Sequence, residues 1–378
     1  MIKSYNLIQY SPMIHFQHDQ KGACLRATEL KPKLDKWINN KLENKRYKLK
    51  VISQGEQILK NNHKMYFGNM KSEESFAKEK LSIYNPKQLI LNINTFFDTA
   101  LAKEIESALP YCFAFENFGT RQSKGFGSFY SDQFIPIETC YKNKQKDYPI
   151  YYFETDDHKD RKKAIDNALD SIQALYKAMK SGINEEYKLE IKNKYMKSLL
   201  WKYFNDEKYP SGFNWEKRIM KQKLMNKKFD ENELTSLYIR GLLGLTNSYT
   251  FRKTYKARMD KDYNDDKNGK HFKLNKEETF LVNHSEIERF KSPITFKPFK
   301  NKVYIILHEL NIKSIQNKTF NFENKSSGEF SLTIPDKTVF SLKPFMDFVC
   351  DKINKNQFGG KFTGKSASLL KNMDIRPL

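Results

Sequence analysis

"QLILNINTFFDTALAKEIESALP", residues 88–110, changes its apolar period halfway, and this change sets the class of fold. Apolar and polar residues alternate from Leu89 to Ile93, which is the period of a half-buried strand. From Phe97 onward the apolar residues recur every four positions, as on one face of a helix, and Pro110 is expected to end that helix. A strand followed at once by a helix predicts a domain that mixes α and β structure.

Segments on both sides of this stretch complete a recognisable order of elements. They predict a strand interrupted at Pro12, a helix, a second strand and a short final strand: "SYNLIQYSPMIHF" (4–16), "TELKPKLDKWINNKL" (28–42), "RYKLKVIS" (46–53) and "GFGSFYS" (125–131). The resulting order, β-α-β-β-α-β, is that of the ferredoxin-like or RRM-like fold. We therefore predict an N-terminal RRM-like domain over residues 1–135.

Helical and strand patterns follow one another again in the second half of the chain. Apolar stripes predict helices at residues 165–179, 185–204, 231–245 and 345–353, the first with Asp156 or Asp157 as its N-cap. Strands are predicted at residues 288–299, 302–310 and 329–334. The prediction is an α+β protein with two ferredoxin-like (RRM-like) domains. The second domain covers residues 146–378 and contains a helical, lysine-rich insertion at about 157–260.

The composition points to a polyanionic partner. The 378 residues include 67 Lys and Arg against 45 Asp and Glu, a formal net charge of +22. Nucleic acid is the default partner of so basic a chain, and the 29 Phe and 21 Tyr supply rings on which bases can stack. A drift of the whole composition towards lysine and asparagine would also raise the charge, without any such function.

Cysteine spacing and hydropathy bear on the compartment. Cys24, Cys112, Cys140 and Cys350 form no CxxC pair, which disfavours a zinc site or a disulfide framework and fits a reducing cytoplasm. No apolar run approaches the roughly 18 residues of a membrane span, and the N-terminus lacks the pattern of a signal peptide. We expect a cytoplasmic protein with no membrane partner, no metal and no other cofactor.

A glycine-rich segment, "ENFGTRQSKGFGSF" (116–129), carries the strongest functional signal. Its glycine spacing and its helix–loop–strand order match neither the P-loop nor the dinucleotide-binding motif, which argues against nucleotide hydrolysis. The glycine N–H groups could cradle a phosphate, with Arg121 as a bidentate donor and Lys124 as a point charge. The alternative is a helix C-cap at Gly119 and a β-bulge at Gly125–Gly127, with no ligand. Spacing alone leaves both alternatives open.

A family resemblance favours the first alternative. "FGTRQSKGFGSF" after a helix resembles the glycine-rich loop of the RAMP superfamily, the RRM-like subunits of CRISPR effector complexes. "YSPMIHF", "LRATELKPKL", "RGLLGL" and "ERFKSPITFKP" follow the order of further RAMP fragments, most similar to the large end subunit of type III-B (Cmr-like) complexes. The chain departs from that pattern at Thr120, which follows a single glycine, and at Pro32, which stands where relatives have glycine.

The resemblance implies an RNA-binding subunit of a type III CRISPR effector, which works in antiviral defence together with other RAMP subunits. Its expected partner is the backbone of crRNA or target RNA, and base pairing rather than this subunit would supply sequence specificity. The expected RNA-binding residues lie in the glycine-rich segment, at the start of the first helix and before the second domain's strands: Gly119, Arg121, Lys124, Gly125, Gly127; Arg26, Lys31, Lys33; Arg289, Lys291.

Two other functions remain open at this stage. A stand-alone endoribonuclease that processes CRISPR repeats without metal would need a general base, for which His15 and His18 are the candidates. A structural adaptor whose charge is only compositional would need no RNA at all. No acidic residue lies in a cleavage or metal-binding motif, so the sequence favours binding over catalysis.

Overall fold

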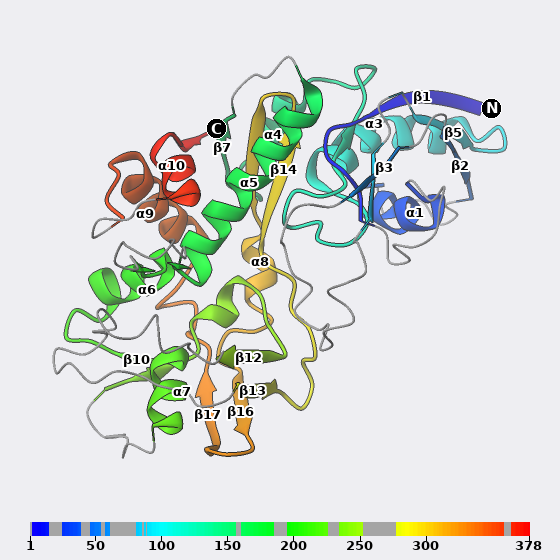
Figure 1. Ribbon diagram of the computed structural model, residues 1–378. Helices are drawn as coiled ribbons and strands as arrows, with labels where there is room; N and C mark the ends of the chain where they lie inside the picture. Colours follow the sequence, from blue (N-terminus) through cyan, green and yellow to red (C-terminus); the bar gives the residue numbers. More distant parts are fainter. Residues whose placement is uncertain are drawn as a thin grey trace.

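The computed structural model of the chain describes residues 2–14, 25–38, 46–53, 57–60, 81–84, 87, 89–155, 160–184, 195–225, 234–251, 277–358 and 364–378. Over these residues the protein combines helices with mostly antiparallel sheets, which confirms the α+β class. Figure 1 shows an N-terminal sheet on one side of a central sheet, with helices α9 (Leu342–Asn354) and α10 (Lys365–Lys371) on the other side.

The N-terminal sheet has four antiparallel strands in the order β2 (Lys48–Ser53), β5 (Leu89–Asn94), β1 (Ile2–Gln9) and β6 (Phe129–Tyr130). Counted along this half of the chain, the strand order is 2-3-1-4. Helices α1 (Ala27–Asp35) and α3 (Thr99–Phe115) pack into one core with β1 and β5. The predicted alternation of β5 is confirmed, because every second residue from Leu89 is buried. Strands β3 (Gln57–Lys60) and β4 (Leu81–Tyr84) form a separate antiparallel pair.

Helix α3 continues past Pro110, so the prediction that this residue ends the helix is wrong. A proline inside a helix removes one hydrogen bond and costs about 3 kcal/mol. The turn that follows contains Cys112, Phe113, Ala114 and Phe115, whose exposed fractions are 0–2%. Burying a large apolar side chain contributes about 1.5–3 kcal/mol, so two phenylalanines offset the proline. Tertiary packing decides the length of this helix.

The central sheet also has four antiparallel strands, in the order β14 (Ile294–Phe299), β15 (Lys302–Leu307), β7 (Ile150–Glu154) and β18 (Arg376–Pro377). Counted from β7, this order is again 2-3-1-4. The predicted strand pair 288–299 and 302–310 is confirmed as β14 and β15.

The two faces of the central sheet belong to different cores. Tyr304 and Ile306 pack into the N-terminal core, together with helix α4 (Ile137–Lys144). Val303 and Ile305 pack into the second core, against helix α5 (Arg161–Lys180). A strand buried on both faces has no need of alternation, which explains its continuous apolar run.

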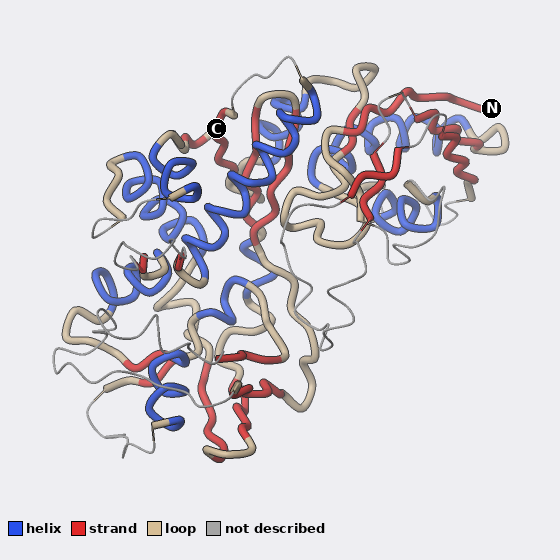
Figure 2. The backbone as a smooth tube through the Cα atoms, in the orientation of Figure 1, coloured by secondary structure: helices blue, strands red, loops and turns tan. Residues whose placement is uncertain are grey.

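Helix α5 begins one turn later than the sequence predicts. Its N-cap is Asp160, whose carboxylate accepts hydrogen bonds from the backbone N–H groups of Lys162 at 2.9 Å and Lys163 at 3.4 Å. The expected caps Asp156 and Asp157 lie outside the described residues. Figure 2 shows α5 as a long helix running alongside the strands of the central sheet.

The region between α5 and β14 is less helical than predicted. It contributes strands to a six-stranded sheet in the order β10 (Asn214–Trp215), β11 (Ser236–Leu237), β17 (Gly328–Thr333), β16 (Thr319–Asn324), β13 (Glu278–Asn283) and β12 (Ser248–Phe251). The pairs β10–β11 and β11–β17 are parallel and the others are antiparallel. A helical insertion at 157–260 is therefore correct only in part.

Short helices contribute further side chains to the second core. They are α6 (Leu199–Tyr203) with a π-helical turn (Phe204–Lys208), α7 (Glu216–Leu224), a 3-10 turn (Arg240–Leu243) and α8 (Glu309–Ile312), beside the strand pair β8 (Ile183–Asn184) and β9 (Tyr195–Met196). The helix predicted at 231–245 is wrong: β11 and the 3-10 turn occupy this segment. Gly244 has a φ of 110°, which a continuous helix does not allow.

Candidate functional site

The glycine-rich segment 116–129 connects α3 to β6 and is fixed to both cores. Phe118 and Phe129 are buried in the N-terminal core, whereas Phe126 is buried in the second core. The backbone of Lys124 forms a bridge to Phe296 of β14. Figure 1 shows this teal segment passing between the N-terminal sheet and the central sheet. Neither Phe126 nor Phe129 is available to stack on a base, because both are fully buried.

The three glycines of the segment are required by its backbone. Gly119, Gly125 and Gly127 have φ values of 82°, 84° and 74°. Their N–H groups donate to the Glu29 carboxylate at 2.7 Å, to the Gln122 carbonyl at 3.3 Å and to the Pro12 carbonyl at 2.9 Å, respectively. Each of these three hydrogens is therefore already donated within the protein.

Arg121 and Lys124 lie beside the C-terminal part of α5. The ammonium group of Lys124 is 4.3 Å from the centre of the Tyr176 ring, a cation–π distance. Burial lowers the pKa of Lys124 to about 8, and the charges of Arg121 and Lys177 lower it as well. Burial also lowers the pKa of Arg121, to about 10. The two residues predicted from glycine spacing are therefore close to each other and partly dehydrated.

Two lysines of α5 that the sequence analysis did not single out complete this group. Lys177 acts electrostatically on Lys124, and Lys180 lies 5.9 Å from the centre of the same Tyr176 ring. The Lys180 ammonium group donates to the Gly244 carbonyl at 2.6 Å. We call Arg121, Lys124, Lys177 and Lys180, with the ring of Tyr176, the Tyr176 cluster. Lysines in the last turn of a helix are common, so their sequence position gives no signal of a site.

Charges of both signs act on Lys180 of the Tyr176 cluster. Burial, together with the charges of Lys124 and Arg240, lowers the pKa of Lys180 to about 7. The carboxylate that opposes this effect is Glu216, which is fully buried and already forms an ion pair with Arg240. An anion that entered this group would therefore meet several cations that repel one another and have lost part of their hydration.

The basic residues expected at the first helix have partners within the protein. Lys31 donates to the Tyr47 carbonyl at 2.9 Å and covers the Tyr47 ring at 3.6 Å. Lys33 donates to Gln122 at 2.9 Å. The Lys33 amine also lies 3.6 Å from the Glu29 carboxylate and 3.7 Å from that of Glu116. These contacts give both lysines a structural role, in which they connect α1 to neighbouring segments.

The remaining predicted residues lie at the start of α1 and in the loop before β14. Arg26 is exposed at the N-terminal end of α1, and Arg289 is exposed in the loop before β14. Desolvation lowers the pKa of Lys291, Glu116 raises it, and Lys33 and Lys36 lower it. The fold thus brings Lys291 close to Lys33 and Lys36.

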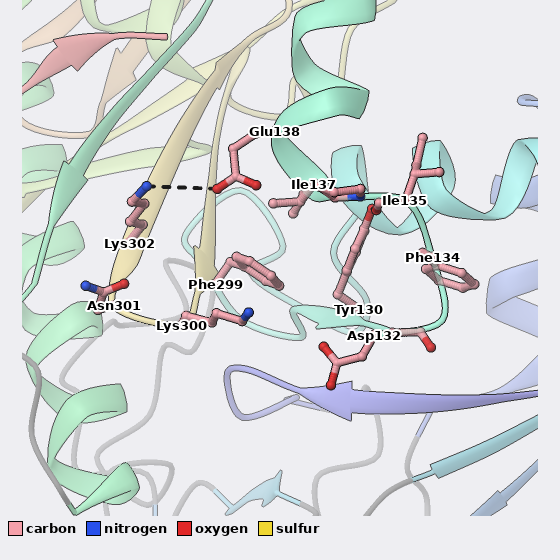
Figure 3. Close-up of a pocket in the computed structure, with 12 residues that line it drawn as sticks. Tyr130, Asp132, Phe134, Ile135, Ile137, Glu138, Phe299, Lys300, Asn301 and Lys302 are labelled. Carbon is pink, nitrogen blue, oxygen red and sulfur yellow. Dashed lines mark hydrogen bonds and ion pairs between the residues drawn. The ribbon is translucent and has the colours of Figure 1, made fainter.

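A shallow hollow of about 290 Å³ lies between the segment after β6 and the β14–β15 hairpin. Figure 3 shows the rings of Tyr130 and Phe299 in this hollow, with Asp132 and Lys300 near its rim. Glu138 lies 3.9 Å from Lys302, the pair joined by the dashed line. The mixed charges of this hollow do not favour a polyanion.

The described residues exclude both histidines considered for catalysis but include a third histidine, His308. His15 and His18 lie outside the described residues. His308 forms a hydrogen bond of 3.1 Å with Thr295, and burial together with Lys291 lowers its pKa to about 4. Its imidazole is therefore neutral near pH 7. Within the described residues no three His, Cys, Asp or Glu side chains gather closely enough to hold a metal ion.

Comparisons with known families cover most of the chain. The Cmr1 N-terminal domain matches residues 1–58 and 44–183, and the Cmr1 C-terminal domain matches residues 195–372. No curated protein matches the chain. In the described part of the structure, each helix is too short or too polar to cross a membrane.

Proposed function

The chain belongs to the Cmr1 family of type III-B CRISPR complex subunits, and from this premise we propose that it binds RNA within that complex through the Tyr176 cluster. The proposed ligand is the phosphate backbone of crRNA or target RNA, and the proposed role is in antiviral defence. The proposed RNA contacts are made by the side chains of Arg121, Lys124, Lys177 and Lys180 and not by the glycine N–H groups.

One observation supports the proposal most directly: Lys124 and Lys180 both lie against the Tyr176 ring, and Arg121 and Lys177 are close enough to lower the pKa of Lys124. Such an arrangement destabilises the free protein because the cations repel one another and have lost hydration. A phosphate group would offset both costs, and it would bind more strongly in this partly dehydrated site than at an open surface.

The chemistry of the cluster implies binding without sequence preference. Arginine and lysine side chains contact phosphates, and phosphate contacts carry no base information. Base pairing between guide and target would supply the specificity, as in other RNA-guided complexes.

We also propose that the chain consists of two RRM-like domains, 1–135 and 146–378. In support, the N-terminal sheet and the central sheet share the strand order 2-3-1-4. Each sheet also has a helix between its first and second strands, α1 and α5, and another before its fourth strand, α3 and α10. On this proposal the Tyr176 cluster lies where the two domains meet, since Arg121 and Lys124 precede β6 and the lysines of α5 follow β7.

The test compares two double variants of equal charge. Lys124→Ala with Lys177→Ala removes two members of the Tyr176 cluster. Lys162→Ala with Lys163→Ala removes two exposed lysines at the other end of α5. Fluorescence anisotropy with a single-stranded RNA as long as a mature guide measures the Kd over a range of salt concentrations.

We expect the cluster variant to bind at least about tenfold more weakly. Its plot of log affinity against log salt should be shallower by about 0.7 for each phosphate that the variant no longer neutralises. The control variant should bind like the unchanged protein. Equal reductions in affinity in the two variants would mean that RNA responds to net charge and not to this cluster, and the proposal would fail.

A further inference from the structure

The turn between β5 and α3 presents two phenylalanine rings at the surface. Phe97 is 86% exposed and Phe96 is 40% exposed. Ile2, which is paired with Asn94 at the end of β1, is 67% exposed. Figures 1 and 2 show this turn at the outer end of the N-terminal sheet, close to the N-terminus and on the opposite side of the molecule from α9 and α10. We call Ile2, Phe96 and Phe97 the Phe97 patch.

The backbone of this turn is strained at both phenylalanines. Phe96 has a φ of 50° and Phe97 has a φ of 70°. A bulky side chain in the left-handed region is an outlier, and two in succession are costly. Asparagine or glycine would adopt these angles more readily. Local conformational preference therefore does not explain why phenylalanine stands at either position.

Neighbouring groups nevertheless hold the turn in one conformation. The N–H of Phe96 donates to the Asn94 side chain at 3.0 Å, and the N–H of Asp98 donates to the Thr95 carbonyl at 3.0 Å. The Asp98 carboxylate then caps α3 by accepting from the N–H of Leu101 at 2.9 Å. These hydrogen bonds thus hold the backbone of both phenylalanines in place at the surface, although burial does not stabilise the Phe97 ring. Strain retained at an exposed site points to a function for the side chains.

Two cations border the patch. The guanidinium carbon of Arg46 is 5.4 Å from the centre of the Phe96 ring, and the Lys48 ammonium group is 5.7 Å from it. Neither cation forms an ion pair within the described part of the chain. Exposed apolar groups beside basic side chains would complement an apolar recess that has carboxylates at its edge.

We propose that the Phe97 patch is a docking surface for another protein subunit of the complex, which receives Phe97 in an apolar recess edged by Asp or Glu. This proposal does not depend on RNA binding at the Tyr176 cluster. Aromatic residues are enriched at the centres of protein interfaces, where a single ring often carries much of the binding energy. Protein is favoured over RNA because Ile2 offers no stacking face and the cations already lie against the Phe96 ring.

The test measures binding of the full chain to the remaining type III-B complex, purified from cells that lack this subunit. Phe97→Asn removes the ring and fits the left-handed conformation. Leu310→Asn is the control, because Leu310 is also exposed, at 69%, but lies in α8 outside the patch. We expect Phe97→Asn to weaken binding at least about 30-fold, the size of an interface hot spot, and Leu310→Asn to change it little.

Thermal unfolding of the isolated variants separates docking from folding. Phe97→Asn should leave the Tm unchanged or raise it, because the variant removes strain and the Phe97 ring is not buried in the folded chain. Arg46→Glu with Lys48→Glu should weaken docking most at low salt. Unchanged binding of Phe97→Asn to the complex would overturn the proposal, and so would a lowered Tm. If Phe97→Asn weakens RNA binding of the isolated chain as much as it weakens binding to the complex, the patch belongs to RNA instead. If Phe97→Asn changes the oligomeric state, the patch contacts a second copy of this chain.

Discussion

At the scale of single residues, the glycines of segment 116–129 show how closely the loop approaches its own backbone. A Cβ atom on Gly127 would lie 1.8 Å from the Phe118 carbonyl oxygen. The φ of Gly127 is 74°, so a side chain would also strain the backbone. The glycine spacing that first suggested a phosphate cradle reflects this close approach.

We therefore predict that Gly127→Ala lowers the free energy of unfolding by about 3 kcal/mol or more, because overpacking adds to the backbone strain. Gly328→Ala is the matched control: its φ is 79° and no atom lies within 4 Å of the added Cβ. That variant should lose only about 1–2 kcal/mol, the cost of the left-handed conformation alone. Urea denaturation measures both values, and equal reductions in stability would show that the close approach to Phe118 is unimportant.

Local sequence signals predict only part of the Tyr176 cluster, because its other residues come from a distant segment. Arg121 and Lys124 were predicted because they lie between glycines, a local signal. Lys177 and Lys180 come from a helix more than 50 residues later, and only the packing of α5 against segment 116–129 brings them close. Lys31 and Lys33 carried the same charge signal, but ion pairs and carbonyl contacts that no sequence pattern reveals give them structural roles.

At the scale of elements, local apolar patterns predict the strands β5, β14 and β15. β5 was predicted from its alternation, and the β14–β15 pair from two apolar runs separated by a short turn. In the segment 231–245 the apolar residues between Leu237 and Leu243 are buried although the chain is not an α-helix, so their spacing resembles that of a helix. Pro110 predicts a helix end that the structure does not have, because the packing of the residues after it outweighs the lost hydrogen bond.

Helix α5 gives a prediction at this scale, because one carboxylate fixes its start. Asp160 accepts two backbone hydrogen bonds at the N-terminus, while the Tyr176 cluster lies near the C-terminus. Asp160→Ala should lower the free energy of unfolding by about 1 kcal/mol, and Asp160→Asn should restore most of it, since asparagine also caps well. RNA affinity at a temperature where both variants are folded should not change. A loss of affinity in Asp160→Ala alone would mean that the cap positions the cluster.

At the scale of the whole molecule, the two cores are joined through a buried lysine. Lys297 of β14 is fully buried. Its amine donates to the carbonyl of Glu116 at 2.9 Å and to that of Phe129 at 3.2 Å. These two carbonyls lie at the two ends of the glycine-rich segment, so one side chain of the central sheet holds both ends of the loop. Burial lowers the pKa of Lys297 to about 7.

This pKa links protonation to the stability of the molecule. Between pH 7 and the ordinary lysine pKa of 10.5, the unfolded chain holds a proton on Lys297 that the folded protein lacks. Stability should therefore rise with pH in this window, because the unfolded state binds more protons, by up to about 1.4 kcal/mol per pH unit for one group. Below pH 7 the penalty for burying the charged amine is fully present.

We predict that Lys297→Met makes this slope shallower by about one proton, as measured by urea denaturation at pH 7, 8 and 9. Lys343→Met removes an exposed lysine and controls for the change in net charge. The Met variant also leaves two carbonyls without their donor, so its absolute stability reflects two opposing effects, and only the slope isolates the proton. A Lys297→Met slope equal to that of the unchanged protein would mean that the amine keeps its proton on folding, and that the two cores are joined by a buried charge.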